Sequence, residues 1–126
     1  MSSPPPTDAE VEILRILWER GSSTVREVHD DISRRKPVGY TTVLKQMQVM
    51  LQKGLLVRSD RFRSHLYEPA QTQTETQRQL AGSMLKQVFD GSARQLLQSA
   101  LAGRKVDRRE LQEIRDVLNE YERKNK

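Results

Sequence analysis

The stretch from residue 37 to residue 68 decides the fold and reads PVGYTTVLKQMQVMLQKGLLVRSDRFRSHLYE. Between Tyr40 and Lys53 its apolar residues recur at helical spacing, at Val43, Met47, Met50 and Leu51. Gly54 follows at the position where glycine commonly ends a helix. The pattern therefore predicts one amphipathic helix over residues 40–53.

A predicted hairpin follows this helix. Residues 55–57 continue into Arg58 as an extended run, residues 59–64 form the predicted turn, and residues 65–68 return as a second strand that ends at Pro69. A helix followed by a short hairpin is the layout of a winged helix-turn-helix domain. In that fold the helix enters the major groove of DNA and the hairpin lies along the phosphate backbone.

The charge of this region supports the same interpretation. Between Arg34 and His65 the sequence holds eight lysines and arginines against one acid, a net charge of +7, whereas the whole chain carries +5. The positive charge is therefore concentrated where the groove-binding element is predicted. The polar face of the helix holds no acid and consists of Thr41, Thr42, Lys45, Gln48 and Gln52. The alternative, a solvated helix and hairpin with ordinary surface charge, stays open.

The composition limits the architecture of the chain. Its 126 residues are enough for one domain, or for one small domain with an appendage. Only 35% of them are apolar, 31% are charged, and the mean hydropathy is −0.77, which favours thin helical parts that complete their cores across a subunit interface. An isoelectric point near 9.8 indicates an anionic partner, with nucleic acid ahead of a membrane surface.

Several classes of site are excluded or disfavoured by the residue types present. The chain has no cysteine, which excludes disulfides, thiolate chemistry and zinc-finger ligation, and its two histidines lack a second ligand at metal spacing. We therefore expect no cofactor and no metal. The first ten residues, MSSPPPTDAE, lack the features of a signal peptide, and no apolar run reaches about 18 residues. By elimination, we expect a cytoplasmic protein without stable membrane association.

The N-terminal part reads as the first two helices of the winged-helix domain, for which we expect bounds of 7–70. Residues 1–6 are rich in serine and proline and are predicted to be disordered. Thr7 and Thr24 each stand three residues before a glutamate, the spacing of a capping box. The first helix ends at Gly21 and the second near Arg35, because Pro37 disfavours helix in the residue before it. Trp18 is expected in the core.

Residues 71–126 are predicted to form a helical dimerisation domain. Residues 70–74 read as a polar linker, followed by helices at about 75–89, at 93–102, and after a capping box at Asp107. These helices are too small to bury their apolar faces alone, so pairing with a second copy is expected, while packing onto the N-terminal domain remains an alternative. The predicted dimer residues are Leu80, Met84, Val88, Leu97, Leu101, Leu111, Ile114 and Leu118.

The chain resembles the BlaI/MecI penicillinase-repressor family of winged-helix regulators over about residues 7–121. The segments that carry the resemblance are TDAEVEILRILWERG, TVREVHDDI, GYTTVLKQMQVMLQKGLLVR, RSHLYEP and ELQEIRDVLNEY. The resemblance implies an N-terminal DNA-binding domain, a C-terminal dimerisation domain, and a homodimer on an inverted-repeat operator that blocks transcription of a resistance or stress-response operon.

The resemblance also implies a route of release. In the best-known members a membrane-embedded sensor metalloprotease triggers cleavage at an Asn-Phe bond in the helix before the last one. The corresponding stretch here reads LQSAL at residues 97–101 and holds no Asn-Phe pair. Release by proteolysis, by a ligand or by neither therefore stays open.

The residues expected to contact DNA lie on the predicted third helix and on the hairpin. Thr41 and Thr42 stand where a recognition helix first meets base edges, and one of them is also expected to cap the helix. Lys45 is expected to contact phosphate or guanine, and Gln48 adenine. Tyr40 either bonds a phosphate or packs under the helix. Two arginines at the hairpin tip are expected to contact the DNA backbone or minor groove, namely Arg61 and Arg63.

A repressor has two functional alternatives, a protein-interaction module and an enzyme. A winged helix can serve as a protein-interaction module without sequence-specific DNA binding, with the helical tail as its docking face. The acid-free face of the helix at residues 40–53 argues against that alternative. An enzyme is not expected, because the sequence offers no histidine paired with a nucleophile, no glycine-rich phosphate loop and no carboxylate pair in an apolar setting.

Overall fold

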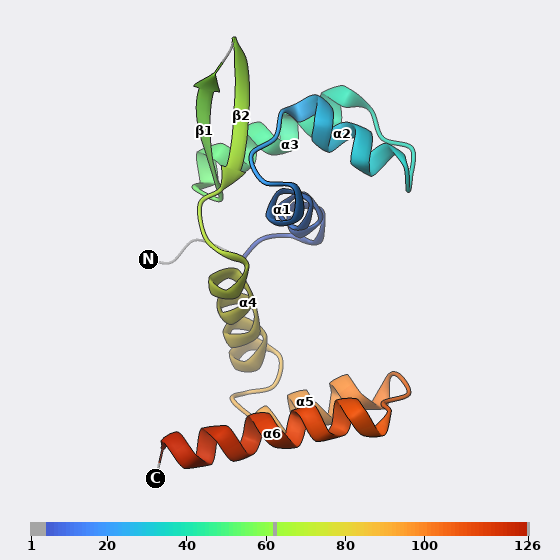
Figure 1. Ribbon diagram of the computed structural model, residues 1–126, viewed down its shortest axis with the longest axis vertical. Helices are drawn as coiled ribbons and strands as arrows, with labels where there is room; N and C mark the ends of the chain where they lie inside the picture. The colour runs from blue at the N-terminus through green and yellow to red at the C-terminus, as the bar shows by residue number, and fades with distance from the viewer. Residues whose placement is uncertain (1–4, 62, 126) are drawn as a thin grey trace. The chain divides into compact units, whose positions relative to one another are not determined.

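The computed structural model describes residues 5–61 and 63–125. Its contacts divide the chain into two units, Met1–Ser83 and Met84–Lys126, which are described separately below. Most of the predicted disordered tail, residues 1–4, lies outside the described residues, and the predicted domain division after residue 70 stays a prediction. Figure 1 shows the order of the elements along the chain.

The first unit begins with three helices, α1 (Asp8–Arg20), α2 (Val25–Ser33) and α3 (Tyr40–Lys53). Both predicted capping boxes are confirmed at the starts of α1 and α2. The Thr7 hydroxyl accepts from the Glu10 amide at 3.2 Å, and the Glu10 carboxylate accepts from the Thr7 amide at 2.9 Å. Thr24 and Glu27 exchange the same two bonds at 3.2 and 2.9 Å. The helix starts are thus fixed by local sequence.

The second helix ends earlier than predicted. α2 stops at Ser33 rather than near Arg35, because the amides of Arg35 and Lys36 both donate to the Ile32 carbonyl, at 2.9 and 3.1 Å. This tightened last turn satisfies the carbonyl without a further helical residue. The three residues before Pro37 are then free to form the turn into α3.

The core of the first unit lies between α1, α2, α3 and the base of the hairpin. Trp18 is half-buried against it, and its indole Nε1 donates to the Gln71 carbonyl at 3.3 Å. This confirms that Trp18 packs with the core. Gly54 closes α3 with φ of 82°, a left-handed conformation that glycine adopts without strain. The buried core residues are Ile13, Leu14, Ile16, Leu17, Val25, Val28, Ile32, Val43, Met47, Met50, Leu56 and Tyr67.

The hairpin pairs β1 (Leu56–Arg61) with β2 (Ser64–Pro69) in antiparallel register, from Leu56 opposite Pro69 to Arg61 opposite Ser64. The predicted turn at residues 59–64 is wrong, since most of that stretch is strand. Pairing up to Arg61 and Ser64 leaves a two-residue loop, and such loops require positive φ values, which Arg63 supplies at 65°. The other loop residue, Phe62, lies outside the described residues.

A single β-bridge lies in the connector before α2. Ser23 pairs with Tyr67, with the Ser23 amide donating to the Tyr67 carbonyl at 3.0 Å and the reverse bond at 2.8 Å. The bridge ties the connector between α1 and α2 to the base of the hairpin. The hairpin is therefore anchored to the helices at its base, and Figure 1 shows its far end extending away from them.

The fourth helix, α4 (Gln73–Gln87), starts and ends two residues earlier than predicted. The predicted linker at residues 70–74 is largely ordered. The Ala70 amide donates to the Leu55 carbonyl at 2.9 Å, and Thr72 caps α4 by accepting from the Glu75 amide at 3.1 Å. Thr72 and Glu75 have capping-box spacing, so the sequence holds a local signal for the start of α4 at Gln73.

The second unit contains α5 (Ala93–Ala102) and α6 (Arg108–Lys124), and the bounds predicted for α5 are confirmed. Asp107 caps α6 by accepting from the Glu110 amide at 2.8 Å, whereas the Glu110 carboxylate pairs with Arg104. The predicted capping box at Asp107 thus has one of its two bonds. Among the helices in the described ranges, none is long and apolar enough to cross a membrane.

Candidate nucleic-acid interface

The third helix divides its residues between core and solvent as predicted. Its buried side, Val43, Met47 and Met50, is fully covered by the core. Its other side is exposed and holds the side chains predicted to contact bases and phosphates, namely Thr41, Thr42, Lys45 and Gln48, with Gln52 beyond them. The polar side chains that α3 turns outward are therefore uncharged or cationic, and Val49 is exposed among them.

The start of α3 differs from the prediction that a threonine caps it. Gly39 is the capping residue, with no side-chain hydrogen bond, because the chain is extended there and turns helical at Tyr40. Thr41 and Thr42 therefore stand second and third inside the helix. The first turn also holds no acid. The first amides of α3 are left without a side-chain acceptor, and the positive end of the helix dipole is uncompensated.

Tyr40 packs against α2 rather than beneath α3. Its ring meets the His29 ring edge to face, with centroids 5.9 Å apart, and the Arg26 guanidinium carbon lies 5.7 Å from its centroid. The residue remains 42% exposed. His29 is itself held by its Nε2, which lies 2.9 Å from the Val38 carbonyl. These contacts fix the junction between α2 and α3.

Most of the positive charge predicted for this region is neutralised within the fold. Arg34 pairs with Asp31 at 3.3 Å, Arg35 and Lys36 pair with Glu12 at 3.7 and 3.0 Å, Lys53 with Glu10 at 2.9 Å, and Arg58 with Asp60 at 3.6 Å. Among the eight cations, the described part of the chain places no carboxylate in ion-pair range of the remaining three. These three are Lys45, Arg61 and Arg63, all of them exposed and all predicted DNA contacts.

The pair between Lys53 and Glu10 is structural. Glu10 is only 6% exposed. Burial by itself raises its pKa, but the Thr7 amide and the Lys53 ammonium outweigh that effect and hold the pKa below its ordinary value of 4.5. The pair joins the start of α1 to the end of α3. Lys53 therefore serves the fold rather than a ligand.

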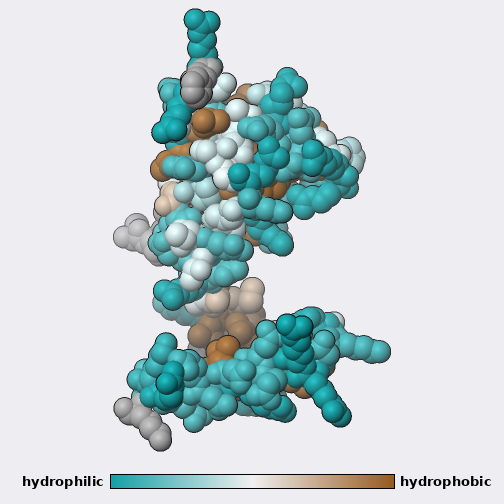
Figure 2. Space-filling view, viewed as in Figure 1, coloured by the Kyte–Doolittle hydropathy of each residue, from teal (hydrophilic) through white to brown (hydrophobic). Residues whose placement is uncertain are grey.

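Cross-strand pairing orders the outer half of the hairpin. The Asp60 carboxylate lies 2.7 Å from His65 Nδ1, which faces it across the strands. This bond, with a smaller contribution from Arg58, lowers the pKa of Asp60. The one acid between Arg34 and His65 is thereby engaged, while Arg61 and Arg63 extend beyond it. Figure 2 shows hydrophilic side chains at the end of the hairpin.

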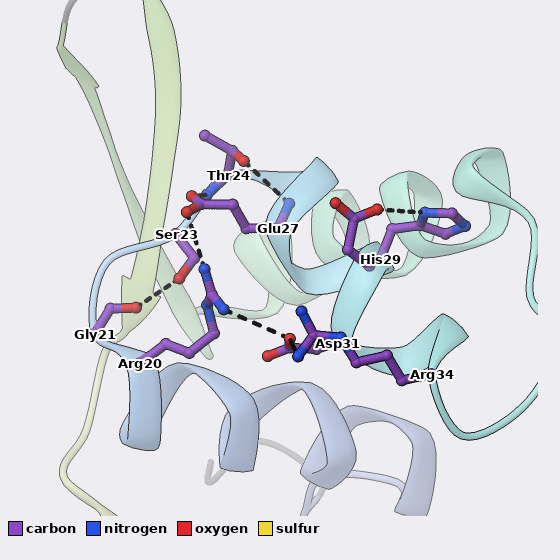
Figure 3. Close-up of polar contacts among 9 residues, drawn as sticks. Arg20, Gly21, Ser23, Thr24, Glu27, His29, Asp31 and Arg34 are labelled. Atoms are coloured by element: carbon purple, nitrogen blue, oxygen red, sulfur yellow. Dashed lines mark hydrogen bonds and ion pairs between the residues drawn. The ribbon is translucent and has the colours of Figure 1, made fainter.

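A second polar network joins α1 to α2 on the side of Arg20. Its guanidinium binds Glu27 at 2.9 Å and Asp31 at 3.5 Å (Figure 3). The Thr24 backbone amide, followed by the hydroxyl and Arg20, lowers the pKa of Glu27 against the effect of burial. The acids of α2 that face α1 are thus engaged by arginines, as Figure 3 shows for Glu27 and Asp31.

The predicted dimer residues of α4, α5 and α6 are not buried in the chain. Met84, Val88 and Leu118 are 53%, 69% and 52% exposed. Within the helices that the structure describes, α5 and α6 contain no buried residue. The other predicted members are half-buried and comprise Leu80, Leu97, Leu101, Leu111 and Ile114. Figure 2 shows apolar side chains at the surface of the second unit.

Sequence reasoning missed two residues of interest. Val117 of α6 is 67% exposed beside Leu118, and helical spacing that included its neighbour would have found it. Arg26 lies over Tyr40 although the two are fourteen positions apart, and no local pattern indicates that contact. Over residues 5–61 and 63–125 no three His, Asp or Glu side chains cluster as they would around a metal ion.

Comparison with known proteins places the chain in a family. The family model described as Penicillinase repressor matches residues 6–120. The chain is 34% identical over 89 residues to the transcriptional regulator BlaI of Mycobacterium tuberculosis, a match that covers 70% of this chain and 64% of that regulator. It is 21% identical to the penicillinase repressor of Bacillus licheniformis over 95% of this chain and 94% of that protein.

A solved structure supports the fold. The solution structure of monomeric Bacillus licheniformis BlaI, in complex with the blaP half-operator, matches with a TM-score of 0.52 and 23% identity over 59% of this chain and 90% of that one. The first unit is therefore a winged helix, as the sequence predicts. Members of the matched family are transcriptional regulators rather than enzymes. On its sequence from residue 6 to residue 120, the chain belongs to the penicillinase repressor family.

Proposed function

We propose that the protein is a transcriptional repressor that binds an inverted-repeat DNA operator as a homodimer. The observation that carries the proposal is the distribution of unpaired charge. Lys45 on α3 and Arg61 and Arg63 on the hairpin are the members of the basic region without an acid in ion-pair range among the described residues. A repressor needs such cations at its groove-facing helix and its hairpin tip, because phosphate contacts position the protein on DNA.

The side chains of α3 have distinct roles in this proposal. Thr41 and Thr42 meet the first base edges with their hydroxyl and methyl groups, and Gln48, two turns along, offers the paired donor and acceptor that suit adenine. Lys45 between them contacts phosphate or guanine, and Tyr40 marks the edge of the contact surface. The uncapped amides at the start of α3 favour a phosphate there.

Homodimerisation is proposed to occur through the second unit. Met84, Val88, Val117, Leu118 and Tyr121 are more than half exposed, which is unusual for so many large apolar side chains in so small a unit. A second copy presents the same surface and can cover it in a two-fold arrangement. Two recognition helices related by a two-fold axis match an inverted repeat.

The regulated genes and the route of release rest on the family resemblance. We propose that the protein acts in the cytoplasm on a resistance or stress-response operon and that a membrane sensor protease relieves repression by cutting the chain. The stretch from Leu97 to Leu101 on α5 holds no Asn-Phe pair, so the proposed cut falls at another bond. Mass spectrometry of protein from induced cells locates that bond, and an intact protein that leaves its operator would overturn this part.

Selection of genomic fragments by the purified protein tests the function. The selected fragment is footprinted at about 50 and 200 mM salt, where neutralised phosphates predict a steep loss of affinity. A two-fold symmetric footprint upstream of a gene, lost at the higher salt, supports the proposal and identifies the target. Diffuse binding without an enriched sequence overturns it in favour of a protein-interaction module.

A further inference from the structure

We infer that Arg26, held over the ring of Tyr40, is an additional DNA phosphate contact. It would extend the contact surface of α3 onto the start of α2. This inference rests on the proposed DNA binding and adds to it a residue outside α3 and the hairpin. Its basis is the contact of Arg26, in the first turn of α2, with the ring of Tyr40 at the uncapped start of α3.

The guanidinium of Arg26 lies over the ring of Tyr40. Arg26 is the second residue of α2 and Tyr40 the first residue of α3, and the Arg26 guanidinium carbon lies 5.7 Å from the Tyr40 ring centroid. At that distance the face of the ring attracts the cation and restricts its position. The arginine is therefore held beside the start of α3, where the first amides have no side-chain acceptor.

The positive charge of Arg26 is available to a ligand. Its sequence neighbour Glu27 is engaged elsewhere, because its carboxylate accepts from the Thr24 amide at 2.9 Å and binds Arg20 at 2.9 Å (Figure 3). Over the described ranges, no carboxylate lies in ion-pair range of Arg26, which is itself exposed. The capping box of α2 thus removes this neighbouring acid from competition for Arg26, and the carboxylate of Asp30, four residues along the helix, lies 3.6 Å from His29 Nδ1.

The Tyr40 ring, the platform on which Arg26 lies, is held in place by α2 and by the turn before α3. The Tyr40 ring meets the His29 ring edge to face at 5.9 Å, and His29 Nε2 lies 2.9 Å from the Val38 carbonyl in the turn before α3. His29 and Arg26 are separated by three positions on α2, so they reach the same ring from one helix face. The ring is fixed to both helices, and the cation loses little further freedom when it meets a phosphate.

A phosphate at the start of α3 would then meet three kinds of hydrogen-bond donor at once. These are the free amides of α3, the exposed hydroxyls of Thr41 and Thr42, and the Arg26 guanidinium, whose planar fork suits a phosphate oxygen pair. Contact with phosphate carries no base information. Arg26 should therefore strengthen binding to all DNA sequences alike.

The test measures affinity for a random-sequence duplex of about 30 base pairs and for the selected operator, with Arg26→Gln and a matched control, Arg15→Gln. Arg15 is exposed on α1, where it lines a hollow together with residues of α1 and α2, and its replacement removes the same charge. We expect Arg26→Gln to lower the salt slope by about 0.9, so that its loss of affinity is about three-fold larger at 50 than at 200 mM salt. Arg15→Gln should keep the wild-type slope.

A double-mutant cycle with Tyr40→Leu tests the platform. If the ring positions Arg26, the two substitutions together cost less than the product of their separate losses. Circular dichroism checks that each variant is folded. A wild-type slope for Arg26→Gln, or fully multiplicative losses in the cycle, overturns the inference. Failure of the wild-type protein to bind any duplex in a salt-dependent way would instead overturn the proposed function.

Discussion

The two units of the chain differ in how they place their apolar side chains. Among its described residues, the first buries twelve apolar side chains between three helices and a hairpin and leaves cations exposed. In the second, α5 and α6 bury no residue within the described ranges and leave large apolar side chains exposed. The first unit thus has a core of its own. The second leaves apolar surface that the proposed second copy would cover.

The largest expected effect is on the free energy of unfolding, which should depend on a methionine of the first unit far more than on one of the second. Met50 of α3 is fully buried, whereas Met84 of α4 is 53% exposed. Met50→Ala should lower the free energy of unfolding by about 2 to 5 kcal/mol, because it leaves a cavity in the core. Met84→Ala should cost less than about 0.5 kcal/mol in the monomer. Urea unfolding followed by far-ultraviolet circular dichroism measures both, and the fluorescence of Trp18, the single tryptophan, reports on the first unit alone. Equal losses at low protein concentration would contradict the distinction between the units.

The next effect concerns the exposed surface of the second unit. Leu118→Lys places a charge on the apolar side of α6, where Leu118 is 52% exposed. The proposed dimer should weaken by about 2 kcal/mol or more, roughly 30-fold in its dissociation constant. The matched control is Asn119→Lys, since the neighbouring position points to another side of the helix. Sedimentation equilibrium measures both variants. Wild-type protein that stays monomeric at every concentration would refute the dimer itself.

The same contrast explains which features were predictable from sequence. Local signals fixed the starts of α1 and α2 through Thr7 and Thr24, and the helical spacing of Val43, Met47 and Met50 identified the buried side of α3. The turn at residues 59–64 was predicted wrongly, because strand pairing between Asp60 and His65 depends on the partner strand rather than on local composition. Tertiary pairing overrode the turn-forming residues.

The candidate interface shows the same division between local and long-range information. The count of eight cations was correct, but five of them form ion pairs with acids within the fold. Glu12 and Glu10 stand far from their basic partners in sequence, so no local pattern could show that Lys36 and Lys53 are engaged. Composition therefore located the basic region, and only the structure separated structural cations from available ones.

Acidic pH should lower the stability of the first unit by protonating the buried Glu10 carboxylate. The folded-state pKa of Glu10 lies below its ordinary value of 4.5, because the Thr7 amide and Lys53 outweigh the effect of burial. The ionised carboxylate therefore stabilises the fold fully above pH 4.5, and this contribution is lost as the pH falls through the lowered pKa. Glu10→Gln should cost about 1 to 2 kcal/mol at pH 7. The difference from wild type should shrink below pH 4.5, and chemical unfolding at several pH values measures it. A constant difference down to pH 3 would show that the charge contributes nothing.

The smallest expected effect is on the salt dependence of DNA binding. It tests whether an arginine that forms an ion pair within the hairpin contributes less to DNA binding than one that does not. Arg58 and Arg61 lie on the same strand, and each replacement by alanine removes one positive charge. Arg58 pairs with Asp60 at 3.6 Å, whereas Arg61 has no acid in ion-pair range among the described residues. Arg61→Ala should therefore weaken binding to all DNA sequences and lower the salt slope by about one unit. Arg58→Ala should change the slope by less, because its charge is already engaged.

Fluorescence anisotropy of a labelled duplex across a salt series measures the slopes of both variants under the same conditions. Equal slopes for the two variants would mean that DNA responds to the summed charge of the hairpin rather than to its tip, since both lose one charge. A reduced slope for Arg61→Ala alone would instead locate a phosphate at the end of the hairpin. The pairing of Asp60 with Arg58 and His65 would then have a function in DNA binding, because it engages the one acid of the hairpin strands near the tip and leaves the terminal arginine free for the backbone.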